Sequence, residues 1–194
     1  MAATRGVKTE DAIVTVATRL FYEKGYHATT MRNIAAGLNI QAGSLYNHFA
    51  SKQDLLLRIC YDTTRALYEG AVPRVEAETD PEARMRALIV WHVQFHANDR
   101  LAALVADEQL TQLEPRNRRK VQKYRDLHEQ LLRSLLTEGR KKLKWQVEDD
   151  AVITFGIATM CTQVDTWYRE DGRLAPSEIA EIFSDFILRG LSGS

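Results

Sequence analysis

The sequence predicts an all-α protein of about nine helices. Apolar residues recur at the three- and four-residue spacing of helical faces, and no segment shows the sustained alternation of a half-buried strand. Glycine and proline, which interrupt helices, contribute only 10 and 4 of the 194 residues. We expect an N-terminal domain of residues 1–52, joined by a long helix to a helical body of residues 53–194.

The first helix is expected to begin near Thr9, after a frayed arm of residues 1–7, and to end at Gly25. Ile13 and Leu20 lie on one of its faces, together with further apolar residues at helical spacing. This face would form part of the core of the N-terminal domain.

Two short helices joined by a tight turn are expected next. Thr30 has the side chain of an N-cap for the first, and Asn39 can take the left-handed conformation that ends a helix. The second would cover residues 41–49 and bury Leu45 and Phe49. Two such helices and their turn form a helix-turn-helix.

The second short helix leaves a polar surface that suits DNA. Ser44, Tyr46 and His48 can donate hydrogen bonds to phosphate oxygens. Gln41 and Asn47 can read the edges of bases in the major groove. With their neighbours, the predicted DNA contacts are Thr29, Thr30, Arg32, Gln41, Ala42, Gly43, Ser44, Tyr46, Asn47, His48 and Lys52.

The run from Thr29 to Lys52, TTMRNIAAGLNIQAGSLYNHFASK, closely resembles the DNA-binding domain of the TetR family of bacterial transcriptional regulators. The usual run in that family is Thr-Thr-x-Arg-Asp-Ile-Ala, followed by Gly-Val-Ser-x-Gly-Thr-Leu-Tyr-x-His-Phe-x-Ser-Lys. The resemblance implies a homodimeric DNA-binding regulator with a ligand-binding body. This chain departs from the usual run at Asn33, Asn39, Ile40, Gln41 and Ser44.

Helix-start signals divide the rest of the chain. Ser51-Lys52-Gln53-Asp54 resembles a capping box and opens the long joining helix, which Pro73 is expected to kink or end. The later helices are expected to start at Asp80-Pro81-Glu82, Asp99, Pro115, Asp149 or Asp150, and Pro176.

Three successive body helices place polar groups inside apolar stripes: His92 and His96, then Glu108, then His128. These groups could line a polar pocket, ligate a metal ion, or be satisfied core or surface positions. No glutamate follows His92, so the metalloprotease signature is absent. We predict pocket lining without a metal, and the ligand-binding set is Leu88, His92, His96, Val105, Glu108, Tyr124, His128, Met160 and Trp167.

The last two helices have more apolar surface than one small domain can cover. We therefore predict that they form the interface of a homodimer, through Ile179, Phe183, Phe186 and Ile187. In proteins of the TetR family, the corresponding pair of helices forms a four-helix bundle with its mate.

A second, shorter resemblance concerns the effector. Trp167-Tyr168-Arg169, Gly172 and Leu174, followed by a proline-led helix, are similar to the C-terminal domains of TetR-family regulators of fatty-acid and sterol catabolism that sense acyl-CoA thioesters. Two basic clusters could hold the phosphates of coenzyme A or could be solvated surface. These clusters are Arg116, Arg118, Arg119, Lys120 and Lys123, and Arg140, Lys141, Lys142 and Lys144.

The zero formal net charge conceals an uneven distribution. Residues 1–52 contain six basic and three acidic residues, a net charge of +3, so the remainder carries −3. A basic end on a neutral-to-acidic body is expected of a DNA-binding domain attached to a ligand-binding body.

Composition and motifs argue against other classes. No run of ~18 apolar residues could span a membrane, and the first residues lack the apolar core of a signal peptide, so a cytoplasmic location is expected. Cys60 and Cys161 are isolated, which favours reduced packing residues. Ser44 follows Gly43 but lies in no Gly-x-Ser-x-Gly elbow, so an enzyme is not expected. No cofactor is expected either.

The sequence thus predicts a ligand-responsive repressor of lipid or sterol catabolism genes, released from a palindromic operator by an acyl-CoA effector. A repressor that senses another hydrophobic molecule, as in the control of drug efflux, is one alternative. The others are an effector-free DNA-binding protein and a helical enzyme or lipid-binding module.

Overall fold

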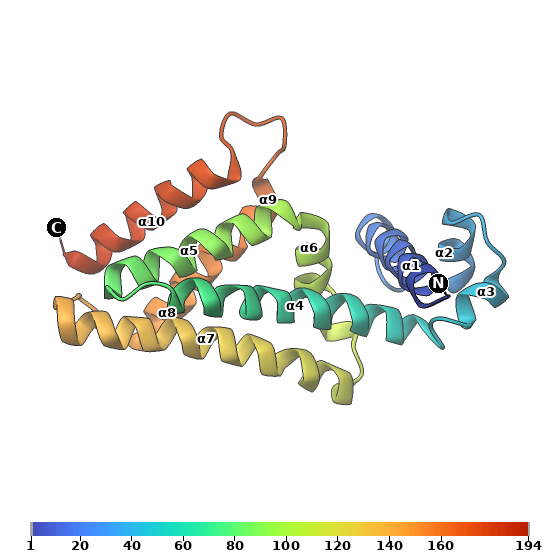
Figure 1. Cartoon of the computed structure of the whole chain (residues 1–194), viewed down its shortest axis with the longest axis horizontal. Helices are drawn as coiled ribbons and strands as arrows, with labels where there is room; N and C mark the ends of the chain where they lie inside the picture. Colours follow the sequence, from blue (N-terminus) through green and yellow to red (C-terminus); the bar gives the residue numbers. More distant parts are fainter. Residues whose placement is uncertain (1, 194) are drawn as a thin grey trace. The chain divides into compact units, whose positions relative to one another are not determined.

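The computed structural model describes residues 2–193 (Figure 1), with side chains described from Thr9 onward. Its elements are α1 (Ala2–Lys24), α2 (Met31–Gly37), α3 (Ala42–Tyr46), α4 (Lys52–Glu76), α5 (Pro81–Asn98), α6 (Arg100–Glu108), the 3-10 helix η1 (Leu110–Gln112), α7 (Pro115–Leu143), α8 (Asp150–Thr162), α9 (Val164–Trp167) and α10 (Pro176–Ser192). The all-α prediction is confirmed over this range. None of these helices has the length and apolarity needed to cross a membrane.

The chain divides into two compact units. The N-terminal unit contains the chain up to Thr64 together with residues 101–122, and the C-terminal unit contains residues 65–100 and 123–194. The boundary expected at residue 52 therefore lies within the N-terminal unit. Because α4 and α7 are long, each contributes residues to both units.

The caps expected around the helix-turn-helix are present. The Thr30 Oγ1 accepts a hydrogen bond from the Asn33 N–H at 3.1 Å, and the Asn33 Oδ1 accepts one from the Thr30 N–H at 2.9 Å. Asn39 has a φ of +60°, the left-handed conformation predicted at the end of α2. At the start of α4, the Asp54 N–H donates to the Ser51 Oγ at 3.1 Å. These local signals fix where α2 begins and ends and where α4 begins.

The N-terminal unit has a core built from segments far apart in the sequence. α1 to α4 contribute buried side chains, among them Phe21, Leu45 and Leu56. Residues from α6 and α7, including Val105 and Val121, belong to the same cluster. The helix-turn-helix is therefore held by a core that extends beyond the first 64 residues.

The structure contradicts the expected frayed arm and the expected end of the long helix at Pro73, and the alternative of a kink at Pro73 stays a prediction. α1 begins at Ala2, so residues 2–7 are helical and not a frayed arm, while Met1 lies outside the described residues. This segment contains no proline to stop a helix from extending toward the N-terminus. α4 continues past Pro73 to Glu76, because one missing N–H donor within a turn of the end removes little of the helical hydrogen bonding.

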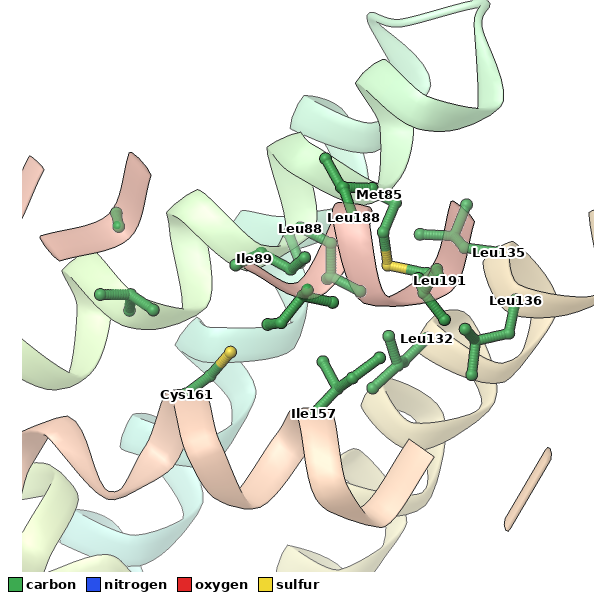
Figure 2. Close-up of a cluster of buried hydrophobic side chains, with 14 of the residues drawn as sticks. Met85, Leu88, Ile89, Leu132, Leu135, Leu136, Ile157, Cys161, Leu188 and Leu191 are labelled. Atoms are coloured by element: carbon green, nitrogen blue, oxygen red, sulfur yellow. The ribbon is translucent and has the colours of Figure 1, made fainter. Parts of the chain in front are cut away.

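The C-terminal unit has its own core, shown in Figure 2. Side chains from α5, α7, α8 and α10 point toward one another there: Met85, Leu88, Ile89, Leu132, Leu135, Leu136, Ile157, Cys161, Leu188 and Leu191. At one end, Trp145 packs directly on Gly139, where an added Cβ would lie 2.0 Å from the indole ring. Glycine is therefore required for this close approach.

Candidate nucleic-acid interface and effector site

The exposed side of α3 is the candidate nucleic-acid interface. Leu45 is fully buried and anchors the helix, whereas Tyr46 keeps 52% of its surface exposed. Gln41 is the N-cap residue but makes no side-chain capping bond, so its amide is not used by the helix. The exposed set also includes Gly43, Ser44 and Asn47. α3 is shorter than predicted, and the Phe49 N–H continues the turn by donating to the Leu45 carbonyl at 3.1 Å.

The remaining predicted DNA contacts differ in accessibility. Arg32 is exposed on α2, and Ala42 is half-buried at the start of α3. Thr30 is exposed, but its hydroxyl donates to the Asn33 Oδ1 at 2.7 Å as part of the cap. The half-buried His48 lies with its Nδ1 3.6 Å from the Glu10 Oε1.

Thr29 and Lys52 hold the protein together at the α1–α2 connection. The Thr29 side chain is fully buried, and its hydroxyl donates to the carbonyl oxygens of Leu20 at 3.0 Å and Gly25 at 2.9 Å. The Lys52 Nζ donates to the carbonyl oxygens of Tyr26 at 2.6 Å and Thr29 at 2.7 Å. Burial lowers the pKa of the Lys52 ammonium. The hydrogen-bonding groups of both side chains thus have protein partners.

A polar network at the base of α4 was not predicted from the sequence. The Gln53 Nε2 donates to the Tyr26 hydroxyl and to the Gln112 carbonyl, both at 2.8 Å. The His27 Nε2 donates to the Gln112 Oε1 at 2.6 Å. Gln112 lies 59 residues from Gln53 and 85 from His27, so no local pattern could have revealed this contact. It fixes η1 to the α1–α2 connection.

The candidate effector site is a buried cluster of three histidines in the C-terminal unit. His92 and His96 come from α5 and His128 from α7, and none is more than 6% exposed. The ring centroids of His92 and His96 are 4.9 Å apart, and those of His92 and His128 are 4.8 Å apart. The three histidines predicted to line the pocket are therefore brought together.

The cluster has polar partners on α8 and α9. The His92 Nε2 is 3.1 Å from the Thr162 Oγ1, and the His96 Nδ1 is 3.1 Å from the Asp165 Oδ2. Burial, with smaller contributions from neighbouring histidines, holds the pKa of His92 well below its ordinary value and lowers that of His128 to about 4. These two rings are neutral near pH 7. Asp165 and Thr162 were not predicted, because the sequence gives no sign that they face α5.

The other members of the predicted ligand set differ in burial and in the unit to which they belong. Leu88 is a core residue (Figure 2), and Val105 belongs to the core of the N-terminal unit. Glu108, on α6, is exposed, and Trp167 is 50% exposed. The two remaining members are the half-buried Tyr124, whose ring is 6.2 Å from that of Tyr68, and Met160, which lines a groove between α8 and α10.

The basic clusters lie on exposed surface of α7 and the loop after it. In the second cluster, Arg140 pairs with Asp150 at 3.2 Å, and Lys142 pairs with Glu138 at 2.8 Å. These two cations thus have protein partners, as expected of a solvated ionic surface.

The predicted dimer helices carry a large exposed apolar surface. Val152 and Phe155 on α8 are 66% and 73% exposed, and Ile182 and Phe186 on α10 are 53% and 67% exposed. Val152, Ile182 and Phe186 line an open groove of about 910 Å³. The predicted Phe183 is half-buried, and Ile179 and Ile187 are 4% and 6% exposed because they pack in the core of their own unit. Only Phe186 of the predicted set is largely exposed.

Family models cover both parts of the chain. A model described as "Bacterial regulatory proteins, tetR family" matches residues 13–59. A model described as "Tetracyclin repressor-like, C-terminal domain" matches residues 78–191, more than half of the chain.

Individual proteins are similar over nearly the whole length. "HTH-type transcriptional repressor KstR2" of Rhodococcus jostii is 28% identical, over 96% of this chain and 92% of the relative. The structure of the TetR family transcriptional regulator PfmR from Thermus thermophilus is 30% identical, with a TM-score of 0.85 over 92% of this chain and 98% of that one. The structure of AibR with isovaleryl coenzyme A and operator DNA shares the fold, at 22% identity and a TM-score of 0.82 over 91% and 96%.

Proposed function

Because the chain belongs to the TetR family of bacterial regulatory proteins, we propose that it acts as a homodimeric repressor that leaves a palindromic operator when it binds an acyl-CoA. As a member of this family the protein is a DNA-binding transcriptional regulator. The dimer, the operator symmetry and the effector class are the proposed parts.

The observation that carries the DNA-binding part is the exposed polar side of α3 above the buried Leu45. In a helix-turn-helix, the second helix lies in the major groove and its exposed residues contact base edges and phosphates. Gln41 and Asn47 carry amides that suit base edges, and Tyr46 carries a hydroxyl that suits phosphate. The shape and chemistry of α3 therefore support insertion into the major groove.

The exposed apolar surface of α8 and α10 supports the dimer. Phe155 and Phe186, both more than half exposed, would lose that exposure against a second copy of the chain. Two-fold symmetry would bring the two copies of α3 to two symmetry-related half-sites about one or more helical turns apart, so the operator is expected to be palindromic.

The effector class is supported by the relatives and by the histidine cluster. Similar proteins are named as a ketosteroid transcriptional regulator and a fatty acid metabolism regulator, and AibR was solved with isovaleryl coenzyme A. Neutral imidazoles buried in an apolar unit suit the polar group of a largely apolar ligand. To reverse a 99:1 preference between two conformations, the ligand must favour one of them by roughly 5.5 kcal/mol. A large acyl group has enough contact area for that difference.

Selection of bound sequences from a random DNA pool tests this proposal, with and without a panel of acyl-CoAs. We expect enrichment of a palindromic sequence whose half-sites are separated by about one or more helical turns, and loss of enrichment with an acyl-CoA. Enrichment that no acyl-CoA reduces would contradict the effector class while leaving DNA binding intact. No enrichment of any sequence would contradict operator recognition.

A further inference from the structure

Thr162, His92 and His128 form a hydrogen-bonded chain through the interior of the C-terminal unit. The His92 Nε2 lies 3.1 Å from the Thr162 Oγ1, and the His92 Nδ1 lies 3.2 Å from the His128 Nε2. The chain ends at the His128 Nδ1, which is buried and has no hydrogen-bond partner among the described residues.

A neutral histidine ring carries one N–H, and this limits the hydrogen-bonded chain of Thr162, His92 and His128 to two arrangements of its protons. In one, the His128 Nε2–H donates to His92 and the His128 Nδ1 is a bare acceptor. In the other, the Thr162 hydroxyl donates to His92, the His92 Nδ1–H donates to His128, and the His128 Nδ1–H is a free donor. Either way a buried polar atom is left unsatisfied, which proteins seldom tolerate without a ligand or an ordered water.

We propose that the His128 Nδ1–H is the donor that recognises the thioester carbonyl oxygen of the acyl-CoA effector, with Thr162 and His92 holding His128 in the tautomer that donates. This inference rests on the proposed acyl-CoA function and assigns its polar contact to one atom. Thr162 and His92 are positioning residues, because they act on the ligand only through His128.

The surroundings favour a neutral carbonyl over a carboxylate. The buried Asp165 carboxylate contacts His96, whose ring lies against that of His92. Burying a free carboxylate beside the neutral rings of His92 and His128 would carry the desolvation cost of a charge. A thioester oxygen accepts a hydrogen bond and brings no charge, so it meets the unpaired donor without this cost.

Matched ligands and matched variants test the proposal in the full-length protein. Hexadecanoyl-CoA and S-hexadecyl-CoA differ by the carbonyl oxygen, and the octanoyl and octyl pair repeats the comparison with a shorter chain. We expect the wild type to bind the thioester about tenfold more tightly than the thioether, as one hydrogen bond to a buried donor would give. A glutamine at position 128 would place its side-chain amide where the histidine Nε2 lies, and an asparagine would place it where the histidine Nδ1 lies. H128Q therefore keeps the contact with His92 and loses the free donor.

H128Q is therefore expected to bind both ligands of a pair equally, and H128N is expected to keep the thioester preference. Ring ¹⁵N shifts provide a second readout, and the thioester complex should show Nδ1–H tautomers at both His92 and His128. An equal affinity of the wild type for thioester and thioether, binding of neither, or an unchanged preference in H128Q would overturn the proposal. Operator binding without ligand, measured in the same preparations, distinguishes these failures from failure of the repressor function.

Discussion

The ammonium nitrogen of Lys52 lies 2.7 Å from the carbonyl oxygen of Thr29, the residue whose hydroxyl donates to two carbonyl oxygens of α1 and its following turn. Lys52 and Thr29 occupy the two ends of the run that resembles the TetR DNA-binding domain. The contact joins the start of α4 to the residue before the N-cap of α2. Both ends of this run therefore position the helix-turn-helix.

The first prediction is that K52M lowers the free energy of unfolding by about 1 to 3 kcal/mol, since the carbonyl oxygens of Tyr26 and Thr29 lose their donor. Methionine keeps most of the side-chain volume. Urea denaturation measures the change, and K120M, at an exposed lysine of α7, is the control expected to leave stability unchanged. Unaltered stability of K52M combined with weaker DNA binding would instead make Lys52 a DNA contact.

Tyr46→Phe and Gln41→Ala should have different effects on DNA binding. Loss of a phosphate contact at Tyr46 weakens binding to all sequences by a similar factor, whereas loss of a base contact at Gln41 relaxes discrimination at particular base pairs by ~1 to 3 kcal/mol. Asn47→Ala is expected to behave like Gln41→Ala. Competition binding against single-base operator variants separates the two effects, and a uniform loss in every variant would refute the assigned roles.

On α10, Phe186→Glu should prevent dimerisation, whereas Ile187→Glu should destabilise the fold of the unit. Phe186 is 67% exposed, so the charge is tolerated by the folded chain but is buried when a second copy docks. Ile187 is 6% exposed, so a charge there destabilises the unit itself. Sedimentation and circular dichroism should show a folded monomer for the first variant and a poorly folded chain for the second. A folded, intact dimer of Phe186→Glu would move the interface elsewhere.

The neutral histidines predict a loss of stability in mild acid. The pKa of His128 falls from 6.5 to about 4 on folding, and that of His92 is lowered in the same direction, so the unfolded chain binds more protons than the folded one below pH 6.5. The stability from neutral burial is complete above pH 6.5 and is lost as the pH falls toward 4. Each histidine contributes a slope of about 1.4 kcal/mol per pH unit within that window.

Urea denaturation of the wild type and of H128Q at pH 7.5, 6.5 and 5.5 measures this linkage. Removing one such histidine should reduce the slope below pH 6.5 by about 1.4 kcal/mol per pH unit. Equal slopes for the two proteins would mean that His128 is not buried in its neutral form.

Local patterns predicted the helices well because their causes are local. The cap at Thr30, the left-handed Asn39 and the proline-led starts of α5 and α10 depend on a few neighbouring residues, and each is present. The core of the N-terminal unit was predicted only in part. Leu45 and Phe49 were expected in it and are buried there, but Val105 and Val121 join it from distant helices.

The sites were only partly predictable for a related reason. Helical spacing shows that Phe186 and Ile187 belong to an apolar stripe, but the packing of α5 and α10 decides that Ile187 faces the core. In the same way, spacing placed His92 and His96 on one face, but only the fold reveals Asp165 as the partner of His96. Composition indicates which residues are able to make a contact, and tertiary packing decides which of them do.

An equilibrium titration of the selected operator complex tests the central claim most directly. The effectors are acyl-CoAs of several sizes, the matching free acids, and free coenzyme A. We predict release by acyl-CoAs with a long or polycyclic acyl group at concentrations at which the acids and coenzyme A leave the complex intact. Release by the free acids at least as effective as release by the thioesters would contradict the acyl-CoA assignment and would leave an unspecified hydrophobic effector in its place.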